Sequence, residues 1–165
     1  MNINQLIAPD RVKCLSGIGS KKRALEALGQ LLSSGAVGID PAYIFHQLIE
    51  RERLGSTGLG HGVALPHGRL KTDEDSPHDT PEVTLGSFIK LDHGIDFDSP
   101  DARPADLLFG LLVPENCTEE HLQILASLAG MFSNTAFCNQ LRNCTTDEDL
   151  YALLSSQQQS QQAAS

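Results

Sequence analysis

The sequence predicts a single α/β domain, a β-sheet flanked by helices. Segments with apolar residues at helical spacing lie before and after short apolar runs that are bounded by glycine and proline, as strands are. The chain has 165 residues and no internal repeat, which is enough for about one domain. We place this domain in residues 1–154 and a separate tail in residues 155–165.

Two helices are expected in the first third of the chain. Residues 1–19 are interpreted as a short apolar start followed by a loop. Ser20 is suited to cap the helix that follows, in which leucines recur at helical spacing. Asp40 and Pro41 form a second start signal, because a capping side chain precedes a proline in the first helical position. This second helix is expected to end near Gly55.

The middle of the chain is expected to supply the strands. Glycines at four positions between 55 and 62 disfavour a regular helix there. A polar, acidic and proline-broken stretch is interpreted as a solvated loop at residues 71–82. The nearly continuous apolar run at 105–113 suits a strand buried on both faces. The other predicted strands are 63–65, 83–91 and 95–97.

Three helices are expected after the last strand. They are predicted at residues 118–132, 134–141 and 146–154. The first carries acidic residues in its opening turn, where the helix dipole favours them. From Ser155 onward the chain consists of Gln, Ser and Ala alone, so this Gln-rich tail is predicted to be disordered for want of large apolar residues to bury.

Composition excludes several classes of partner. The formal net charge of −9 disfavours nucleic acids and anionic membrane surfaces, which require a basic footprint. No apolar run approaches the roughly 20 residues that span a bilayer, and the N-terminus lacks the features of a signal peptide. Four cysteines without paired spacing fit reduced thiols, so we expect a cytoplasmic protein; they are Cys14, Cys117, Cys138 and Cys144.

Residues suited to phosphoryl transfer occur at the ends of the predicted elements. His67 follows a strand end and precedes a glycine, which lets a ligand approach closely. The glycine run before it can offer free backbone N–H groups to an anion. Arg51 ends the second helix and suits phosphate oxygens, and His121 lies in the first turn of a helix, where anions are favoured. A neutral imidazole can attack phosphorus among such donors without any bound metal or cofactor.

Each of these residues also has an ordinary structural interpretation. Arg51 can pair with a neighbouring glutamate at the surface. His61 precedes His67 by six residues, so both can face the same way in an extended segment, and we keep it as a possible auxiliary residue. A metal hydrolase built on these two histidines and His121 is disfavoured, since no clustered carboxylate joins them. No role is assigned to His46, His78 and His93.

Four segments together resemble a known family; they are residues 50–60, 63–69, 106–114 and 120–125. In combination they look like the IIA proteins of the bacterial phosphotransferase system, in the fructose/mannitol superfamily. Within this superfamily the chain is most similar to the nitrogen-regulatory branch, called PtsN or IIA-Ntr. The similarity lies in the motif Arg-Glu-Arg-Leu-Gly-Ser-Thr-Gly and in the single-domain size. The resemblance covers roughly residues 3–154. Position 61 departs from it, because relatives commonly carry Asn or another polar residue there.

The resemblance implies a mixed β-sheet flanked by helices and a phosphorylated His67 that Arg51 and His121 support. The phosphoryl donor would be an HPr-like protein, NPr, in a relay fed by phosphoenolpyruvate. The chain would be a regulatory phosphocarrier, a phosphotransferase component with a phosphohistidine intermediate rather than a stand-alone enzyme. Its phosphorylation state would control nitrogen- and potassium-related targets such as sensor kinases or transporters. The alternatives are a sugar-specific IIA component serving a fructose- or mannitol-type IIB, and a binding module without phosphotransfer, which the intact residue set disfavours.

Overall fold

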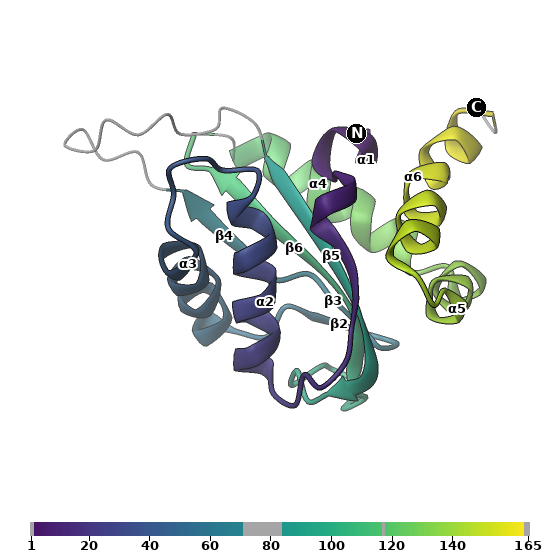
Figure 1. Cartoon of the computed structure of the whole chain (residues 1–165), viewed down its shortest axis with the longest axis horizontal. Helices are drawn as coiled ribbons and strands as arrows, with labels where there is room; N and C mark the ends of the chain where they lie inside the picture. Colours follow the sequence, from purple (N-terminus) through teal and green to yellow (C-terminus); the bar gives the residue numbers. More distant parts are fainter. Residues whose placement is uncertain (1, 71–83, 117, 164–165) are drawn as a thin grey trace.

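A mixed six-stranded sheet forms the centre of the computed structural model, which describes residues 2–70, 84–116 and 118–163 (Figure 1). The strand order is β1-β5-β6-β3-β2, and β4 also pairs with β6. The β5–β6 and β2–β3 pairs are antiparallel, whereas the other pairs are parallel. The strands are β1 (Val12–Leu15), β2 (Gly58–Gly60), β3 (Val63–Ala64), β4 (His67–Leu70), β5 (Leu85–Ile95) and β6 (Ala105–Pro114). The predicted α/β class with a mixed sheet is confirmed.

The central strand β6 explains why two hydrophobic cores exist. Every residue from Leu107 to Val113 is buried, so both faces of this strand need a cover. Leu107 and Phe109 point into one core, whereas Leu108 and Leu112 point into the other, as the two-residue period of a strand requires. The sheet therefore separates two apolar layers.

Helices α2 (Lys21–Ser33) and α3 (Pro41–Leu54) cover one face of the sheet (Figure 1). The other face is covered by α1 (Ile3–Leu6), α4 (Thr118–Phe132), α5 (Thr135–Asn143) and α6 (Asp147–Ala163). A 3-10 turn, η1 (Pro9–Arg11), leads into β1. The predicted caps are present, since Ser20 Oγ accepts from the N–H of Arg23 at 3.1 Å and Asp40 Oδ1 from that of Ala42 at 2.9 Å.

Several strands and one helix end differ from the sequence prediction. β4 was not predicted, and the strands predicted at 83–91 and 95–97 are replaced by one strand, β5, which ends at Ile95. β1 and β2 fall in segments interpreted as loops, because strands of four and three residues carry too little periodicity to be recognised. Helix α6 continues to Ala163, where a disordered Gln-rich tail was expected from Ser155. Gln and Ala are good helix formers and extend a helix that Leu150 and Leu154 anchor in the core. The predicted loop 71–82 lies outside the described residues.

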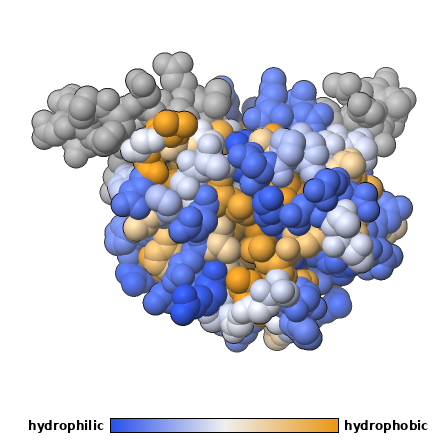
Figure 2. All heavy atoms as spheres, in the orientation of Figure 1, coloured by the Kyte–Doolittle hydropathy of each residue, from blue (hydrophilic) through white to orange (hydrophobic). Residues whose placement is uncertain are grey.

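The surface agrees with the acidic, ordinary composition of the chain. Figure 2 shows hydrophilic residues spread over one face, with apolar residues gathered toward its centre. Large apolar side chains that stay exposed are few in the described part of the chain; they are Val37, Leu54, Leu59 and Leu122. Within residues 2–70, 84–116 and 118–163, no helix is both long enough and apolar enough to cross a membrane.

Candidate functional site

His67 is the first residue of β4, whereas the sequence analysis placed it just beyond a strand. It lies opposite Leu111 of the buried strand β6, whose N–H donates to the carbonyl oxygen of Pro66 at 2.9 Å. Gly68 lets α3 approach this strand, because a Cβ there would lie 2.9 Å from the Cβ of Gln47. The histidine therefore stands at the start of a strand against which α3 packs closely.

The ring of His67 has a defined tautomer. Its Nδ1 lies 2.9 Å from the carbonyl oxygen of Leu65. A carbonyl oxygen only accepts hydrogen bonds, so we assign the proton to Nδ1 and a free lone pair to Nε2. Nε2 is thus the nitrogen that can act as a nucleophile.

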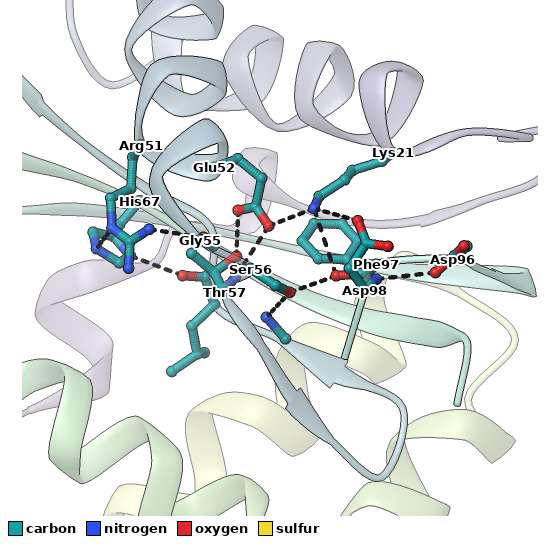
Figure 3. A network of polar contacts seen from close by, with 12 residues as sticks. Lys21, Arg51, Glu52, Gly55, Ser56, Thr57, His67, Asp96, Phe97 and Asp98 are labelled. Carbon is teal, nitrogen blue, oxygen red and sulfur yellow. Dashed lines mark hydrogen bonds and ion pairs between the residues drawn. The ribbon is translucent and has the colours of Figure 1, made fainter. Parts of the chain in front are cut away.

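Arg51 reaches Nε2 from the last turn of α3 (Figure 3). Its Nε–H donates to Nε2 of His67 at 3.2 Å, and its NH1 donates to the carbonyl oxygen of Gly55 at 2.9 Å. The guanidinium has five N–H donors, so others remain for the oxygens of an incoming phosphoryl group. The sequence analysis also considered a surface ion pair between Arg51 and a neighbouring glutamate. In the structure Arg51 instead contacts His67 and Gly55.

His121 also lies against His67. The centroids of the two rings are 5.0 Å apart, with the planes tilted by 55°. The residue is 5% exposed, and its Nδ1 has no hydrogen-bond partner among the described residues. A buried polar atom without a partner costs free energy, so this nitrogen is left with an unused capacity for a hydrogen bond.

The surroundings of both histidines lower their pKa values. Burial lowers the pKa of His67, and the charge of Arg51 lowers it further, while the hydrogen bond to Leu65 raises it. Burial lowers the pKa of His121 to about 4, with further contributions from His67, Arg69 and Arg51. An imidazole must be neutral to attack phosphorus, so this electrostatic setting favours a nucleophilic His67 at neutral pH.

A hollow of about 330 Å³ opens beside these residues. Its wall is polar on the side of Arg51 and Ser56 and apolar on the side of α4. The full lining consists of Arg51, Ser56, Thr57, Gly58, Leu59, Leu65, His67, Leu125, Ala126 and Ala129. The site is thus open enough for a side chain of a partner protein to reach His67.

His61 is not brought to this site. It is exposed in the turn between β2 and β3, at a φ of 57°, between Gly60 and Gly62, which also have positive φ. Its N–H donates to Asp101 at 2.8 Å, its carbonyl oxygen accepts from Arg142 at 2.8 Å, and it is absent from the hollow's lining. The sequence analysis assumed one extended segment from His61 to His67, but this turn interrupts it. Gly60 and Gly62 supply the positive φ angles that the turn requires.

Glu52 and Thr57 lie beside the site and were not singled out in the sequence. Glu52 is 7% exposed although it belongs to a charged helix end. Its position four residues after Leu48 and eight after Ile44 places it on the buried stripe of α3, a signal that its charge obscures. Across the described residues, no three His, Cys, Asp or Glu side chains come together in a way that could hold a metal ion.

The sequence matches a family described as the phosphoenolpyruvate-dependent sugar phosphotransferase system, EIIA 2, over residues 5–157. The chain belongs to this EIIA 2 family. It is 40% identical over 154 residues to a nitrogen regulatory protein of Pseudomonas aeruginosa, covering 93% of this chain and 95% of that protein. It is 38% identical over 152 residues to the one of Escherichia coli K12, covering 92% and 86%.

A solved structure supports the same membership. The crystal structure of the nitrogen regulatory protein IIA-Ntr from Neisseria meningitidis is 39% identical, with a TM-score of 0.77, and the match covers 92% of this chain and 98% of that one. The family resemblance read from the sequence motifs is thereby confirmed. The matched range contains His67, Arg51 and His121 as well as the turn that carries His61.

Proposed function

We propose that this EIIA 2 protein is a regulatory phosphocarrier that accepts a phosphoryl group on Nε2 of His67. One observation carries the proposal. The proton on Nδ1 is bound by Leu65, while the free Nε2 faces Arg51 at 3.2 Å and the ring of His121 lies 5.0 Å away. A nucleophile, a cation and a second imidazole thus lie together, and the first two line an open hollow.

The transfer needs no bound metal in this chain. The donor is the phosphohistidine of an HPr-like protein, NPr, charged in a phosphoenolpyruvate-dependent relay. The lone pair of Nε2 attacks phosphorus, the donor's N–P bond breaks with its electron pair left on the donor nitrogen, and a new N–P bond forms on His67. Nδ1 keeps its proton, and the carbonyl of Leu65 stabilises the positive charge that the ring gains.

Arg51 and His121 serve the phosphoryl oxygens. When phosphorus bonds to Nε2, the Nε–H of Arg51 loses its acceptor and turns to a phosphoryl oxygen beside it. His121 is neutral and buried, and a proton on its unpaired Nδ1 can be donated to a second oxygen. These donors spread the charge of the transferring group without reorganising the sheet.

We infer regulation as the purpose of the transfer. Proteins named nitrogen regulatory protein match nearly the whole chain at up to 40% identity, which favours this branch. The phosphorylated and free forms would differ in binding to nitrogen- or potassium-related targets such as sensor kinases or transporters. The family description names a sugar phosphotransferase system, which favours a second candidate, a IIA component that passes phosphate to a fructose- or mannitol-type IIB. Onward transfer of label to such a IIB distinguishes the two.

Labelled phosphoenolpyruvate tests the proposal directly. With enzyme I and the HPr-like carrier present, the chain should acquire an acid-labile, base-stable label. His67→Ala should abolish the label, because it removes the attacking nitrogen, whereas the matched control His61→Ala should retain it. An unlabelled wild-type chain, with donors shown to be active, would contradict the proposal.

A further inference from the structure

Glu52 is a buried carboxylate in an unfavourable place. It lies in the last turn of α3, where the helix dipole disfavours negative charge, and it is only 7% exposed. Burying an ionised carboxylate is strongly unfavourable unless its oxygens are well bound. Glu50, one half-turn earlier, stays exposed and pairs with Arg53. The two glutamates share a helix end but differ in what they contact.

Three donors bind the carboxylate of Glu52 (Figure 3). The N–H of Thr57 donates to Oε1 at 3.0 Å, and the hydroxyl of Thr57 donates to Oε2 at 2.6 Å. Lys21 Nζ lies 2.7 Å from Oε1 and balances the charge. Thr57, itself buried, is therefore bound through both its backbone and its side chain.

Thr57 continues this set of contacts to the histidine. Its carbonyl oxygen accepts from the N–H of Leu65 at 3.0 Å. The carbonyl oxygen of Leu65 in turn binds Nδ1–H of His67 at 2.9 Å. The position of Thr57 is thus transmitted through Leu65, which lies between β3 and β4, to the atom that fixes the tautomer of the ring.

A second set of contacts starts from the neighbouring helix residue. Arg51 donates to the carbonyl oxygen of Gly55 and to Nε2 of His67. The short segment from Gly55 to Thr57 is therefore bound to α3 at both ends, by Arg51 and by Glu52. The two sets of contacts meet on the two nitrogens of one imidazole.

We propose that Glu52 is a positioning residue for phosphoryl transfer, acting through Thr57 to hold the Leu65 carbonyl that keeps the proton of His67 on Nδ1. It touches no reacting atom, since its oxygens face Thr57 and Lys21. The inference rests on the proposed phosphorylation of His67. This role explains why the carboxylate of Glu52 is buried at a helix end. Its oxygens bind Thr57 and Lys21, whereas the adjacent Arg51 binds Gly55 and His67.

Glu52→Gln tests this role with little change in volume. The amide is neutral, so the ion pair with Lys21 is lost, and its N–H₂ group fits Oγ1 of Thr57 only if that hydroxyl turns to accept a hydrogen bond instead of donating one. We expect nitrogen-15 NMR of the unphosphorylated full chain to show a mixture of His67 tautomers in place of Nδ1–H alone. Phosphorylation by the HPr-like carrier should be about tenfold slower at saturating donor, with an unchanged KM for the donor. Glu50→Gln, the matched control, should behave as the wild type does.

A second pair of variants covers the case in which Glu52→Gln does not fold. Thr57→Val removes only the hydroxyl donor, so it should shift the tautomer and slow transfer in the same direction but less. Thr57→Ser keeps that donor and should transfer faster than Thr57→Val. A folded Glu52→Gln with a single tautomer and the wild-type rate would overturn the proposal, as would equal behaviour of the two Thr57 variants.

Failure of the proposed function gives a different result. A wild-type chain that accepts no phosphoryl group from active donors would contradict the phosphocarrier proposal and, with it, any part of Glu52 in transfer. The tautomer measurement needs no donor. It still decides whether Glu52 controls the state of the His67 ring.

Discussion

The start of β4 and the turn between β2 and β3 lie six residues apart and each present a histidine, yet the two environments differ. His67 is held by its side chain, through Leu65 on one nitrogen and Arg51 on the other. His61 is held by its backbone, through Asp101 and Arg142, and its ring is exposed. Hydrogen bonds to the ring orient the reactive nitrogen of His67. Hydrogen bonds to the backbone of His61 stabilise the turn and do not orient its ring.

Arg51→Ala should give the largest loss after removal of His67 itself. The variant lacks the cation that faces Nε2, so transfer should slow by about 100-fold, as for the loss of one charge-stabilising donor. Single-turnover phosphorylation by the charged carrier measures the rate. Circular dichroism should match the wild type, because Arg51 serves the phosphoryl group; a collapsed spectrum would make the residue structural instead.

His121→Ala should have a smaller effect, about tenfold on the same rate. The variant removes one neutral donor but leaves the nucleophile and the arginine in place. A complete loss, equal to that of His67→Ala, would contradict the assignment of His67 as the acceptor. Mapping of the labelled peptide in the wild type identifies the acceptor independently.

Acidification should affect the two histidines of the site in a predictable direction. Burial lowers the pKa of His67, so its NMR titration midpoint should lie below 6.5. The pKa of His121 is lowered to about 4, so its ring should stay neutral through pH 5. A midpoint of His67 at or above 6.5 would contradict the neutral nucleophile.

The same pKa shifts predict how stability depends on pH. Below pH 6.5 the unfolded chain binds protons on these rings that the folded chain does not, so the free energy of unfolding falls as pH drops. For His121 the loss between pH 6.5 and 4 is at most about 3 kcal/mol, from 1.36 kcal/mol per pKa unit, and solvent screening reduces it. Urea unfolding across this range measures it, and His121→Ala should flatten the profile.

His61→Ala should have the smallest effect, with transfer within about twofold of the wild type. The backbone contacts of the turn do not need the imidazole. The positive φ at this position is tolerated less well by alanine, so stability should fall by about 1 kcal/mol. A tenfold loss of transfer would place His61 in the site and remove the contrast between the two histidines.

Local signals in the sequence were sufficient for much of the fold. Ser20 and Asp40 mark helix starts through capping, which depends only on near neighbours, and the apolar run of β6 identifies a doubly covered strand. The sequence analysis missed strand β1 because its four residues form a strand only by pairing with β5, where Val12 lies opposite Phe88. Long-range pairing of short strands leaves little trace in local periodicity.

The site was accessible from the sequence only in part. Residue types and the family resemblance pointed to His67, Arg51 and His121, and the structure places them together, while their roles stay predictions. The tautomer of His67 depends on where one carbonyl points, which no pattern of residue types encodes. Glu52 was overlooked because its charge suggested a solvated helix end, although its spacing from Leu48 indicates the buried side.

The His67 ring contacts residues from helices on both faces of the sheet. Arg51 arrives on a helix packed in one layer, and His121 on a helix packed in the other. Loosening of either layer would therefore displace one of the ring's two neighbours. We therefore expect packing defects on either face of the sheet to shift the NMR resonances of the His67 imidazole.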